Sequence, residues 1–489
     1  MVAQSTAEIR KRLDREVGRI DRRAPFTVAL AYPSPYHTGM SSLGYLQMYR
    51  LIQEEPGIAC ERAFLPEAEG EAALTYESLR PLSEFPVIAM SVAYELELAG
   101  VVRMLEDAGL ESLREKRSDR DPFILAGGPL TFSNPLPLAA FADAIVMGEA
   151  EDVGLEALRV LEGAPSKAAA LEALARTPHV FVPAHHGADM PAIAKAGGAS
   201  LPAWAPIRTP DTELSNMFLL EAERGCSRAC TYCVMRRSTN GGMRLASTER
   251  ILELVPRDAT KVGLVGAAVS DHPKIAEILN ALADSGRTVG VSSLRPDRLS
   301  DELVGALKRA GYKTLTTAMD GPSERLRASL ERRARVKHLE RAAELARAHG
   351  MQRLKLYLMV GLPSETDEDI DECAELVSTL SRTIPVALGI APFCAKRNTP
   401  LDGAPFAGIA TVNARLARLR AKLKGRGDVR ATSARWAWVE YVLAQGGVEE
   451  GRAVRDAVHA SGSFAAYKAA FEAVERRAPK RRSLAIAAV

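Results

Sequence analysis

Several features common in secreted and membrane proteins are missing from this sequence. No apolar run reaches the roughly 18 residues that a membrane-spanning helix needs. The amino-terminal stretch MVAQSTAEIRKRLDREVGRID lacks the apolar core of a secretory signal. Only six cysteines occur in 489 residues, too few for a disulfide framework. These absences predict a cytoplasmic protein without a membrane span, in which clustered cysteines indicate metal or redox chemistry.

An excess of either charge is also absent. The chain has 64 basic and 61 acidic residues, for a net charge of +3. This balance argues against a dedicated nucleic-acid or membrane-surface protein, so we do not expect nucleic acid as a partner. A short basic run, RRAPKRRS at 476–483, is typical of a solvated tail. Hydrophobic residues make up 47% of the chain, enough for large cores, and the length suggests about three domains.

Short apolar runs alternate with helical patterns over residues 25–162. The runs FTVALAYP, PVIAMSV, FILAGGP and DAIVMGE read as buried parallel strands, each reaching Pro, Ser or Gly where a loop would begin. This alternation predicts a doubly wound, Rossmann-like α/β domain, whose ligand-facing loops lie at the carboxyl ends of its strands. We expect a helix before it, over 1–24, and a connector rich in Pro and Gly after it, over 163–214.

A second alternation predicts a partial (β/α)6 barrel over 215–407, with its chemistry at the carboxyl ends of the strands. The rest of the chain, 408–489, is rich in Ala and Arg and is expected to be helical. The six candidate barrel strands are 217–223, 261–267, 288–294, 313–319, 354–361 and 385–393.

Three cysteines follow the first candidate barrel strand: Cys226, Cys230 and Cys233, spaced C-x3-C-x2-C. A closed structural zinc site needs four ligands, and no further Cys or His lies nearby. A redox pair of the thioredoxin type does not need three thiols. Three thiolates can instead hold a [4Fe–4S] cluster and leave one iron open. We favour the cluster and keep zinc as the alternative.

This spacing, with Tyr232 before the last cysteine and a barrel strand before the first, resembles the signature of radical S-adenosylmethionine (SAM) enzymes. The resemblance implies that the open iron binds SAM. An external flavodoxin- or ferredoxin-type donor would reduce the cluster, and SAM would be cleaved to a 5′-deoxyadenosyl radical. Segments VGAAVSDHP and KLYLMVGLPSETDEDI also resemble superfamily motifs. The cofactor contacts implied in the barrel are Tyr232, Gly266, Ser292, Ser293 and Arg295; helix capping is the alternative role for the two serines.

The first domain extends the resemblance. The blocks YPSPYHTGMSSLGYLQMY, MSVAYELELAGVVRML and AGGPLTFSNPLPLAAFADAIVMGEAED resemble, in order, those of a large and little-characterised subfamily of cobalamin-binding-domain radical SAM enzymes. Cobalamin is therefore an implied cofactor, although the D-x-H-x-x-G motif is absent. His37 is more typical of a hydrogen-bonding group than of a cobalt ligand, and Met40 and Met90 are more typical of core. The implied cobalamin-facing residues are Tyr36, Gly39, Ser41, Ser91, Tyr94, Glu95, Gly127, Gly128, Gly148 and Glu149; for the glycines, a role in turns is the alternative.

Two segments depart from the subfamily pattern. AMDGP puts Asp320 where relatives carry an Ala-Pro-Glu-type segment. FCAKRNTP places Cys394 at the end of the sixth candidate strand, as a core thiol or as a barrel-mouth residue that meets the substrate.

The resemblance implies methyl transfer to an unactivated carbon of a small-molecule or peptide substrate. The first alternative is a radical SAM enzyme without functional cobalamin, carrying out rearrangement, cyclisation or methylthiolation. Methylthiolation is disfavoured because such enzymes have a second cysteine triplet in the first domain, where this chain has only Cys60. The second alternative is a non-enzymatic, RNA-associated iron–sulfur protein.

Overall fold

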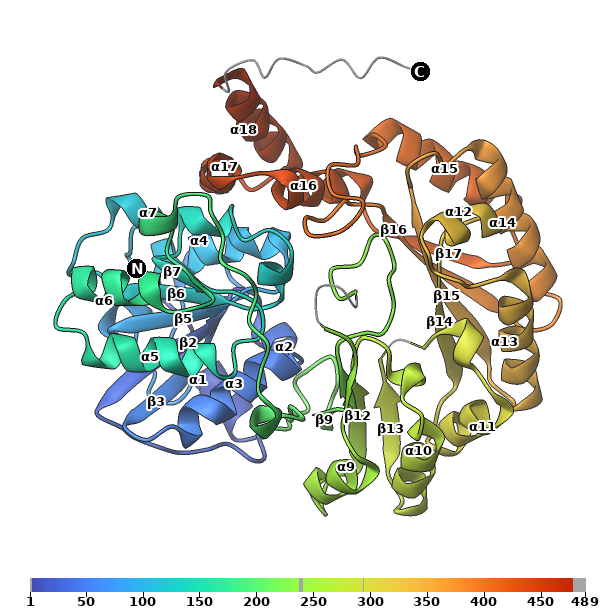
Figure 1. Cartoon of the computed structure of the whole chain (residues 1–489), viewed down its shortest axis with the longest axis horizontal. Coiled ribbons are helices and arrows are strands. Elements are labelled where there is room, and N and C mark those ends of the chain that lie inside the picture. The colour runs from blue at the N-terminus through green and yellow to red at the C-terminus, as the bar shows by residue number, and fades with distance from the viewer. Residues whose placement is uncertain (1, 237–240, 293, 478–489) are drawn as a thin grey trace.

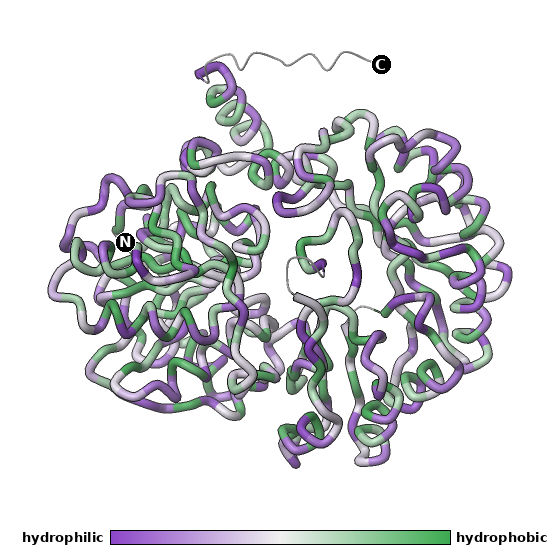
Figure 2. The backbone as a smooth tube through the Cα atoms, in the orientation of Figure 1, coloured by the Kyte–Doolittle hydropathy of each residue, from purple (hydrophilic) through white to green (hydrophobic). Residues whose placement is uncertain are grey.

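The computed structural model describes residues 2–236, 241–292 and 294–477. Two α/β domains lie side by side, and the C-terminal helices extend across one end of both (Figure 1). Apolar residues concentrate in the central strands and polar residues on the outer helices (Figure 2). Within the described residues, no helix is both long and apolar enough to span a membrane.

The first domain is built on one twisted sheet of six strands. Its first five strands in spatial order pair in parallel, and the last pairs antiparallel to its neighbour. All four predicted strands are present. The spatial order is β3 (Ile58–Phe64), β2 (Phe26–Tyr32), β5 (Val87–Ser91), β6 (Phe123–Gly127), β7 (Ala144–Val146) and β8 (Val180–Phe181).

Helices α3 (Leu43–Glu54), α4 (Leu98–Asp107) and α5 (Val153–Gly163) cover this sheet. Part of the expected connector also belongs to the domain, because β8 completes the sheet and α6 (Lys167–Arg176) packs against it. A two-residue strand has no periodicity to detect, which explains why the composition of 163–214 suggested only a connector. The expected amino-terminal segment contains α1 (Thr6–Leu13).

The second domain is an open barrel of seven parallel strands, in two sheets. The sheets meet where the Ala318 N–H donates to the Leu294 carbonyl at 3.3 Å. The six predicted strands all occur. One sheet has the order β13 (Thr288–Val291), β12 (Lys261–Val265), β9 (Met217–Glu221); the other has β14 (Thr314–Asp320), β15 (Arg353–Val360), β16 (Val386–Pro392) and β17 (Asp428–Ala431).

Strand β17 lies in the segment that was expected to be wholly helical. It pairs in parallel with β16 at the sheet edge. Its sequence, DVRA, alternates polar and small apolar residues, so it lacks the apolar run that marks the buried strands. The barrel helices are α9 (Thr248–Leu254), α10 (Ile275–Asp284), α11 (Asp301–Arg309), α12 (Glu324–Ser329), α13 (Val336–Ala348), α14 (Asp367–Leu380) and α15 (Ile409–Lys422).

Strand β15 shows that the barrel interior is open. Its outward side chains, such as Leu354 and Leu356, are buried beneath the helices. The inward side chains of Tyr357 and Met359 are exposed or half-buried. An accessible lumen therefore leads to the carboxyl ends of the strands.

The C-terminal helices tie the two domains together. Helices α16 (Ala434–Gln445), α17 (Val448–Ala460) and α18 (Phe464–Arg477) follow the barrel. Val439, Val454 and Phe471 nevertheless belong to the hydrophobic core of the first domain, together with α4. The basic run 476–483 begins at the end of α18, and its residues 478–483 lie outside the described part of the chain.

Candidate active site

The three clustered cysteines lie in one loop at the carboxyl end of β9. The loop connects β10 (Glu223–Arg224) to β11 (Arg244–Leu245), which pair with each other. Backbone hydrogen bonds hold its centre: the Thr231 N–H donates to Leu330 O, and the Leu401 N–H donates to Thr231 O, both at 3.2 Å. The loop is therefore fixed against two other loops of the barrel mouth.

Cys230 is buried, and Cys226 and Cys233 are half-buried. Burial raises the pKa of all three thiols, and for Cys233 burial together with the neighbouring Cys230 and Cys226 raises it to about 11. In the described residues no three Cys, His, Asp or Glu side chains are gathered closely enough to hold a metal ion. Three thiols in one loop at the barrel mouth are nevertheless the donor set that a three-thiolate [4Fe–4S] cluster requires. Binding would draw the sulfur atoms together.

Asp320 and Arg332 form an ion pair beside this loop. Burial raises the pKa of Asp320, and Arg332 opposes that shift. Burial lowers the pKa of Arg332, but Asp320, and after it the nearby Tyr232 and Cys230, raise it overall. Asp320 has a φ of +66°, a strained backbone conformation for a non-glycine residue at a strand end. The carboxylate singled out in the sequence thus lies next to the cysteine loop, paired with an arginine.

Two of the predicted SAM contacts are joined to each other. The Gly266 N–H donates to Ser292 Oγ at 3.1 Å, and Ser292 Oγ donates to Gly266 O at 2.7 Å. A Cβ atom on Gly266 would lie 2.3 Å from Glu223 Oε1 and 2.9 Å from the Glu223 backbone oxygen, so a side chain there would force Glu223 to shift. Ser292 thus joins the carboxyl ends of β12 and β13 and does not cap the next helix. Ser293 lies outside the described residues.

Arg295 has a different environment from the one expected. It is 3% exposed, and its guanidinium bonds Asp271 at 3.1 Å and Asp297 at 2.5 Å. Arg228 of the cysteine loop reaches the same two carboxylates, at 3.2 and 3.6 Å. The structure therefore shows Arg295 in a buried ionic group that anchors the cysteine loop, with its donors already engaged.

A cavity of about 480 Å³ lies between the two domains, which we call the first cavity. The carboxyl ends of β5, β6 and β7 form one wall, and β9, β12 and the cysteine loop form the other. Gly225, Val234 and Met235 of the loop take part. Of the predicted cofactor residues, the cavity brings together Ser91, Gly127, Gly128, Gly148, Glu149 and Gly266; Met90 also lines it.

The glycines of this wall are not equivalent. Gly128 and Gly148 have positive φ values, and a Cβ there would lie 2.6 and 2.7 Å from backbone oxygens. Both are therefore needed for the turns as well as lining the cavity. At Gly127 a Cβ would meet only Val146, at 3.6 Å, which is an ordinary contact. Gly127 is thus not required by the fold, and it leaves space in the cavity.

An ionic cluster links the domains at the edge of the first cavity. Arg224 bonds Glu151 at 2.5 Å, Glu221 at 2.6 Å and Glu149 at 3.5 Å. Arg244 pairs with Glu149 as well, and the Ala196 N–H donates to that carboxylate at 2.7 Å. The Glu149 carboxylate is therefore already bonded to two arginines and a backbone N–H of the protein.

Glu223 was not predicted from the sequence. It is 1% exposed and lines the first cavity. Its Oε1 accepts from the Ala268 N–H at 2.6 Å, while Oε2 has no hydrogen-bond partner in the described part of the chain. Burial raises the pKa of Glu223 to about 7. Its position three residues before Cys226 is the only signal in the sequence, and that signal does not distinguish it from a structural carboxylate.

A second cavity, of about 470 Å³, lies on the other side of the cysteine loop. It is lined by Tyr232, by Met359 of β15, by the end of β16 and the residues after it, by α16 and by the loop after β5. Tyr94 lines it, and Glu95 bonds Lys396 of its wall. Tyr94 and Glu95, which were predicted to face cobalamin, therefore lie beside the second cavity and not the first, because their loop turns toward α16. Cys394 also lines this cavity, as a barrel-mouth residue.

Three further predicted residues lie away from both cavities. Tyr36 is buried, stacks on Tyr76 and donates to Glu16 at 2.8 Å. Gly39 allows contact with Phe64, whose ring would be 2.6 Å from a Cβ. Ser41 Oγ donates to the His37 carbonyl.

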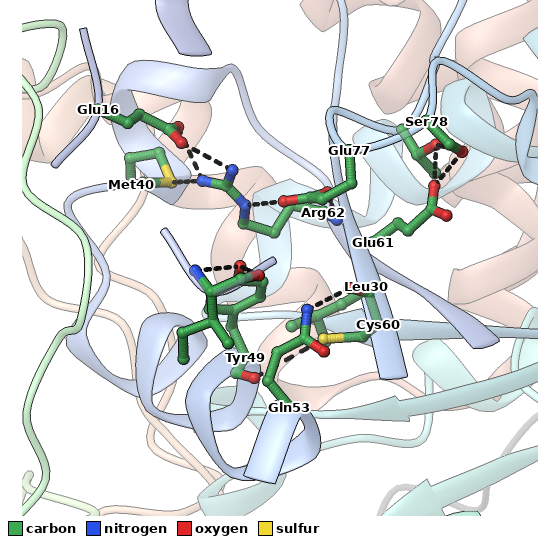
Figure 3. Close-up of polar contacts among 12 residues, drawn as sticks. Glu16, Leu30, Met40, Tyr49, Gln53, Cys60, Glu61, Arg62, Glu77 and Ser78 are labelled. Atoms are coloured by element: carbon green, nitrogen blue, oxygen red, sulfur yellow. Dashed lines mark hydrogen bonds and ion pairs between the residues drawn. The ribbon is translucent and has the colours of Figure 1, made fainter. Parts of the chain in front are cut away.

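A buried ionic group explains why the segment that contains Tyr36, Gly39 and Ser41 lies away from both cavities. Arg62 of β3 bonds Glu16 at 2.8 Å and Glu77 at 2.7 Å, with Met40 Sδ beside it (Figure 3). Met40 is a core residue, as expected, and His37 is exposed on the outside of the segment. The prediction of cofactor contacts at Tyr36, Gly39 and Ser41 is corrected because their segment packs onto β3 instead of the cavity.

Two family models match the chain. The model described as "Radical SAM proteins, N-terminal" matches residues 44–183, and the model described as "Radical SAM superfamily" matches residues 221–377. Uncharacterized protein MJ0966 of Methanocaldococcus jannaschii is 29% identical over 396 residues, which span 78% of this chain and 80% of that protein. The tRNA-2-methylthio-N(6)-dimethylallyladenosine synthase of Bacillus licheniformis is 28% identical over 168 residues, or 31% of this chain and 33% of that protein.

The fold has a counterpart among solved structures. The cobalamin-dependent S-adenosylmethionine radical enzyme OxsB, with aqua-cobalamin and S-adenosylmethionine bound, matches 82% of this chain with a TM-score of 0.51 and 13% identity. This chain spans 56% of the length of that structure. The agreement extends over both α/β domains. With matching radical SAM models over the first domain and over the barrel, the chain belongs to the radical SAM superfamily.

Proposed function

We propose that this radical SAM enzyme binds cobalamin in the first cavity and methylates an unactivated carbon. One observation carries the proposal. The first cavity is shared between the carboxyl ends of the Rossmann-like sheet, where such folds bind ligands, and the loop of Cys226, Cys230 and Cys233. A cofactor held by the first domain would therefore face the cluster site directly.

The residues present suit the implied groups. The three cysteines would hold the [4Fe–4S] cluster, and Gly266 with Ser292 would contact SAM beside it. Ser91, Gly127, Gly128 and Gly148 would hold cobalamin, with Gly127 leaving room that a side chain would fill. When bound, the cluster and SAM supply a 5′-deoxyadenosyl radical, and cobalamin supplies the methyl group. An external flavodoxin- or ferredoxin-type protein would provide the electrons.

The protein's own contribution is to position these groups and keep water out. The wall of the first cavity is largely apolar, with Leu30, Met48 and Leu125 among its side chains. Arg224 bonds Glu221 at the end of β9 and two carboxylates of the first domain, Glu149 and Glu151, so it joins the two walls of the cavity. Glu223 presents an oxygen that can accept a hydrogen bond from a bound amide or ammonium group.

The decisive experiment is anaerobic purification from cells supplied with cobalamin, followed by reconstitution of the cluster. We expect iron–sulfur absorbance, co-purification of a corrinoid and reductant-dependent formation of 5′-deoxyadenosine. A preparation that cleaves SAM but never retains a corrinoid would overturn the cobalamin assignment alone. A reconstituted protein without SAM cleavage would contradict the activity itself.

Methylthiolation is the second candidate, because the tRNA-2-methylthio-N(6)-dimethylallyladenosine synthase named above is 28% identical to this chain over 168 residues. Its requirement for a second cysteine triplet in the first domain is not met by the sequence. The one cysteine of that domain, Cys60, is 1% exposed within β3. Analysis of products for added sulfur would separate this reaction from methylation.

A further inference from the structure

Four aromatic residues from separate segments line the second cavity. Tyr94 comes from the loop after β5, Tyr232 from the cysteine loop, Phe393 from the end of β16, and Trp436 from α16. Its volume of about 470 Å³ falls within the range typical of small-molecule sites. The carboxyl ends of barrel strands are also where catalytic barrels bind substrates.

Two of these rings are unusually exposed. Tyr94 is 45% exposed and Trp436 is 37% exposed, although both lie on the wall of one cavity. Isolated exposed aromatics are ordinary, but apolar surface gathered in a concave site marks a place that a ligand covers. Tyr232 lies between Cys230 and Cys233 in sequence, so a ligand in this cavity would reach the edge of the cluster loop.

At the second cavity, carboxylate groups outnumber ammonium groups. Lys396 Nζ donates to Glu95 Oε2 and to Glu440 Oε1, each at 2.7 Å. Lys396 is the only basic residue among the described residues that line the cavity. Of its two partners, Glu440 also lines the cavity, whereas Glu95 lies behind the wall, so one ammonium group is shared between two carboxylates and one negative charge is in excess.

That excess is not relieved by the protein. Glu95 is 2% exposed, and its Oε1 has no hydrogen-bond partner within the described residues. Burial on its own would lower the pKa of Lys396, but Glu95 and Glu440 raise it to about 12. Lys396 is therefore fully charged at neutral pH and can supply no further positive charge. A buried carboxylate without full compensation is costly, and a second cation would offset that cost.

We propose that the second cavity binds a small organic cation, a protonated amine or a quaternary ammonium group attached to an apolar body. Aromatic faces attract such groups through their ring quadrupoles, and the excess carboxylate charge attracts them as well. The inference rests on the proposed function only in making this cation the substrate of the radical reaction. Binding itself requires neither cobalamin nor SAM cleavage.

Ligands that share a benzyl group and differ in charge test the proposal on the full-length reconstituted protein. Calorimetric titration would compare benzyltrimethylammonium and benzylamine with neutral benzyl alcohol and anionic phenylacetate. We expect both cations to bind about tenfold more tightly than the alcohol, and the anion to bind most weakly. Equal affinity for cation and alcohol, or no detectable cation binding at millimolar concentration, would overturn the proposal.

Variants locate the binding in the second cavity. Glu440→Gln and Trp436→Leu should each weaken the affinity for the two cations by about five- to tenfold. Trp438→Phe is the matched control, because Trp438 is on the same helix but packs against Phe464 and Phe471. Cation binding unchanged in both cavity variants would exclude this site. SAM cleavage without added ligand is measured separately, so failure of the proposed function stays distinct from failure of this inference.

Discussion

Gly266 and Ser292 exchange hydrogen bonds across neighbouring strand ends, with the hydroxyl of Ser292 accepting from the Gly266 N–H at 3.1 Å and donating to its carbonyl at 2.7 Å. Ser292→Ala removes both contacts. We expect a loss of about 1 kcal/mol in the free energy of unfolding, and SAM affinity weaker by about fivefold because the Gly266 segment loosens. Equilibrium denaturation and SAM titration measure the two effects.

Ser300→Ala is the control for this prediction. Ser300 Oγ accepts from the Leu303 N–H at the start of α11, away from both cavities, and the loss of such a cap costs about 1 kcal/mol as well. SAM affinity should stay unchanged in this variant. If both variants weaken SAM binding equally, Ser292 acts through stability and not through the site.

The three-cysteine loop predicts a sharp dependence of iron content on single residues. Replacement of Cys226, Cys230 or Cys233 by Ala should remove nearly all bound iron and sulfide and abolish SAM cleavage. Cys373→Ala is the matched control, because Cys373 is fully buried in the core on α14. That variant should lose some stability but keep its iron. Retention of a full cluster in any of the three loop variants would contradict the ligand assignment.

Gly127 gives a test of the first cavity that leaves the backbone intact. Gly127→Leu fills the space beside Val146 without a backbone clash, so we expect a folded protein that no longer co-purifies with a corrinoid. Absorbance of the corrinoid per chain measures the effect. Gly163→Leu places the same side chain at the end of α5, where a Cβ meets nothing within 4 Å, and should retain the corrinoid.

Glu223 predicts a pH dependence of stability. Its pKa is about 7 in the folded protein against an ordinary value of 4.5, so the folded state binds more protons between these values. The stabilisation is complete below pH 4.5 and is lost as the pH rises through about 7, by up to about 3 kcal/mol. Glu223→Gln should flatten this slope between about pH 5 and 8, whereas Glu249→Gln, on an exposed helix turn, should not. Parallel slopes in wild type and Glu223→Gln would exclude Glu223 as the source.

The fold could largely be predicted because most of its strands are short runs rich in apolar residues. Runs such as FTVALAY of β2 and RLKLYLMV of β15 carry enough apolar residues to be recognised without tertiary information. Strands β8 and β17 could not, because one has two residues and the other lies at a sheet edge with two of its four residues charged. Their pairing is decided by neighbours that are distant in the sequence.

Site residues could be placed from the sequence only at strand ends, because there the strand determines which cavity a residue faces. Ser91 and Gly127 are the last residues of β5 and β6, Gly148 lies just after β7, and the parallel sheet brings them together at one edge. Tyr94 is only three residues beyond Ser91, yet its loop leans toward α16, more than 300 residues later in the chain. Arg295 was misjudged for a similar reason, because the carboxylates of Asp271 and Asp297 that surround it are apparent only once the loops are folded.

The loop of Cys226–Cys233 has one further consequence for turnover. It contributes Gly225, Val234 and Met235 to the first cavity and Tyr232 to the second, and no described residue lines both. The loop therefore acts as a partition between two chambers. With cofactor and substrate in the two cavities as proposed above, a molecule on one side could leave and be replaced while the other side stays occupied, so the cofactor would not need to be released each time a product departs.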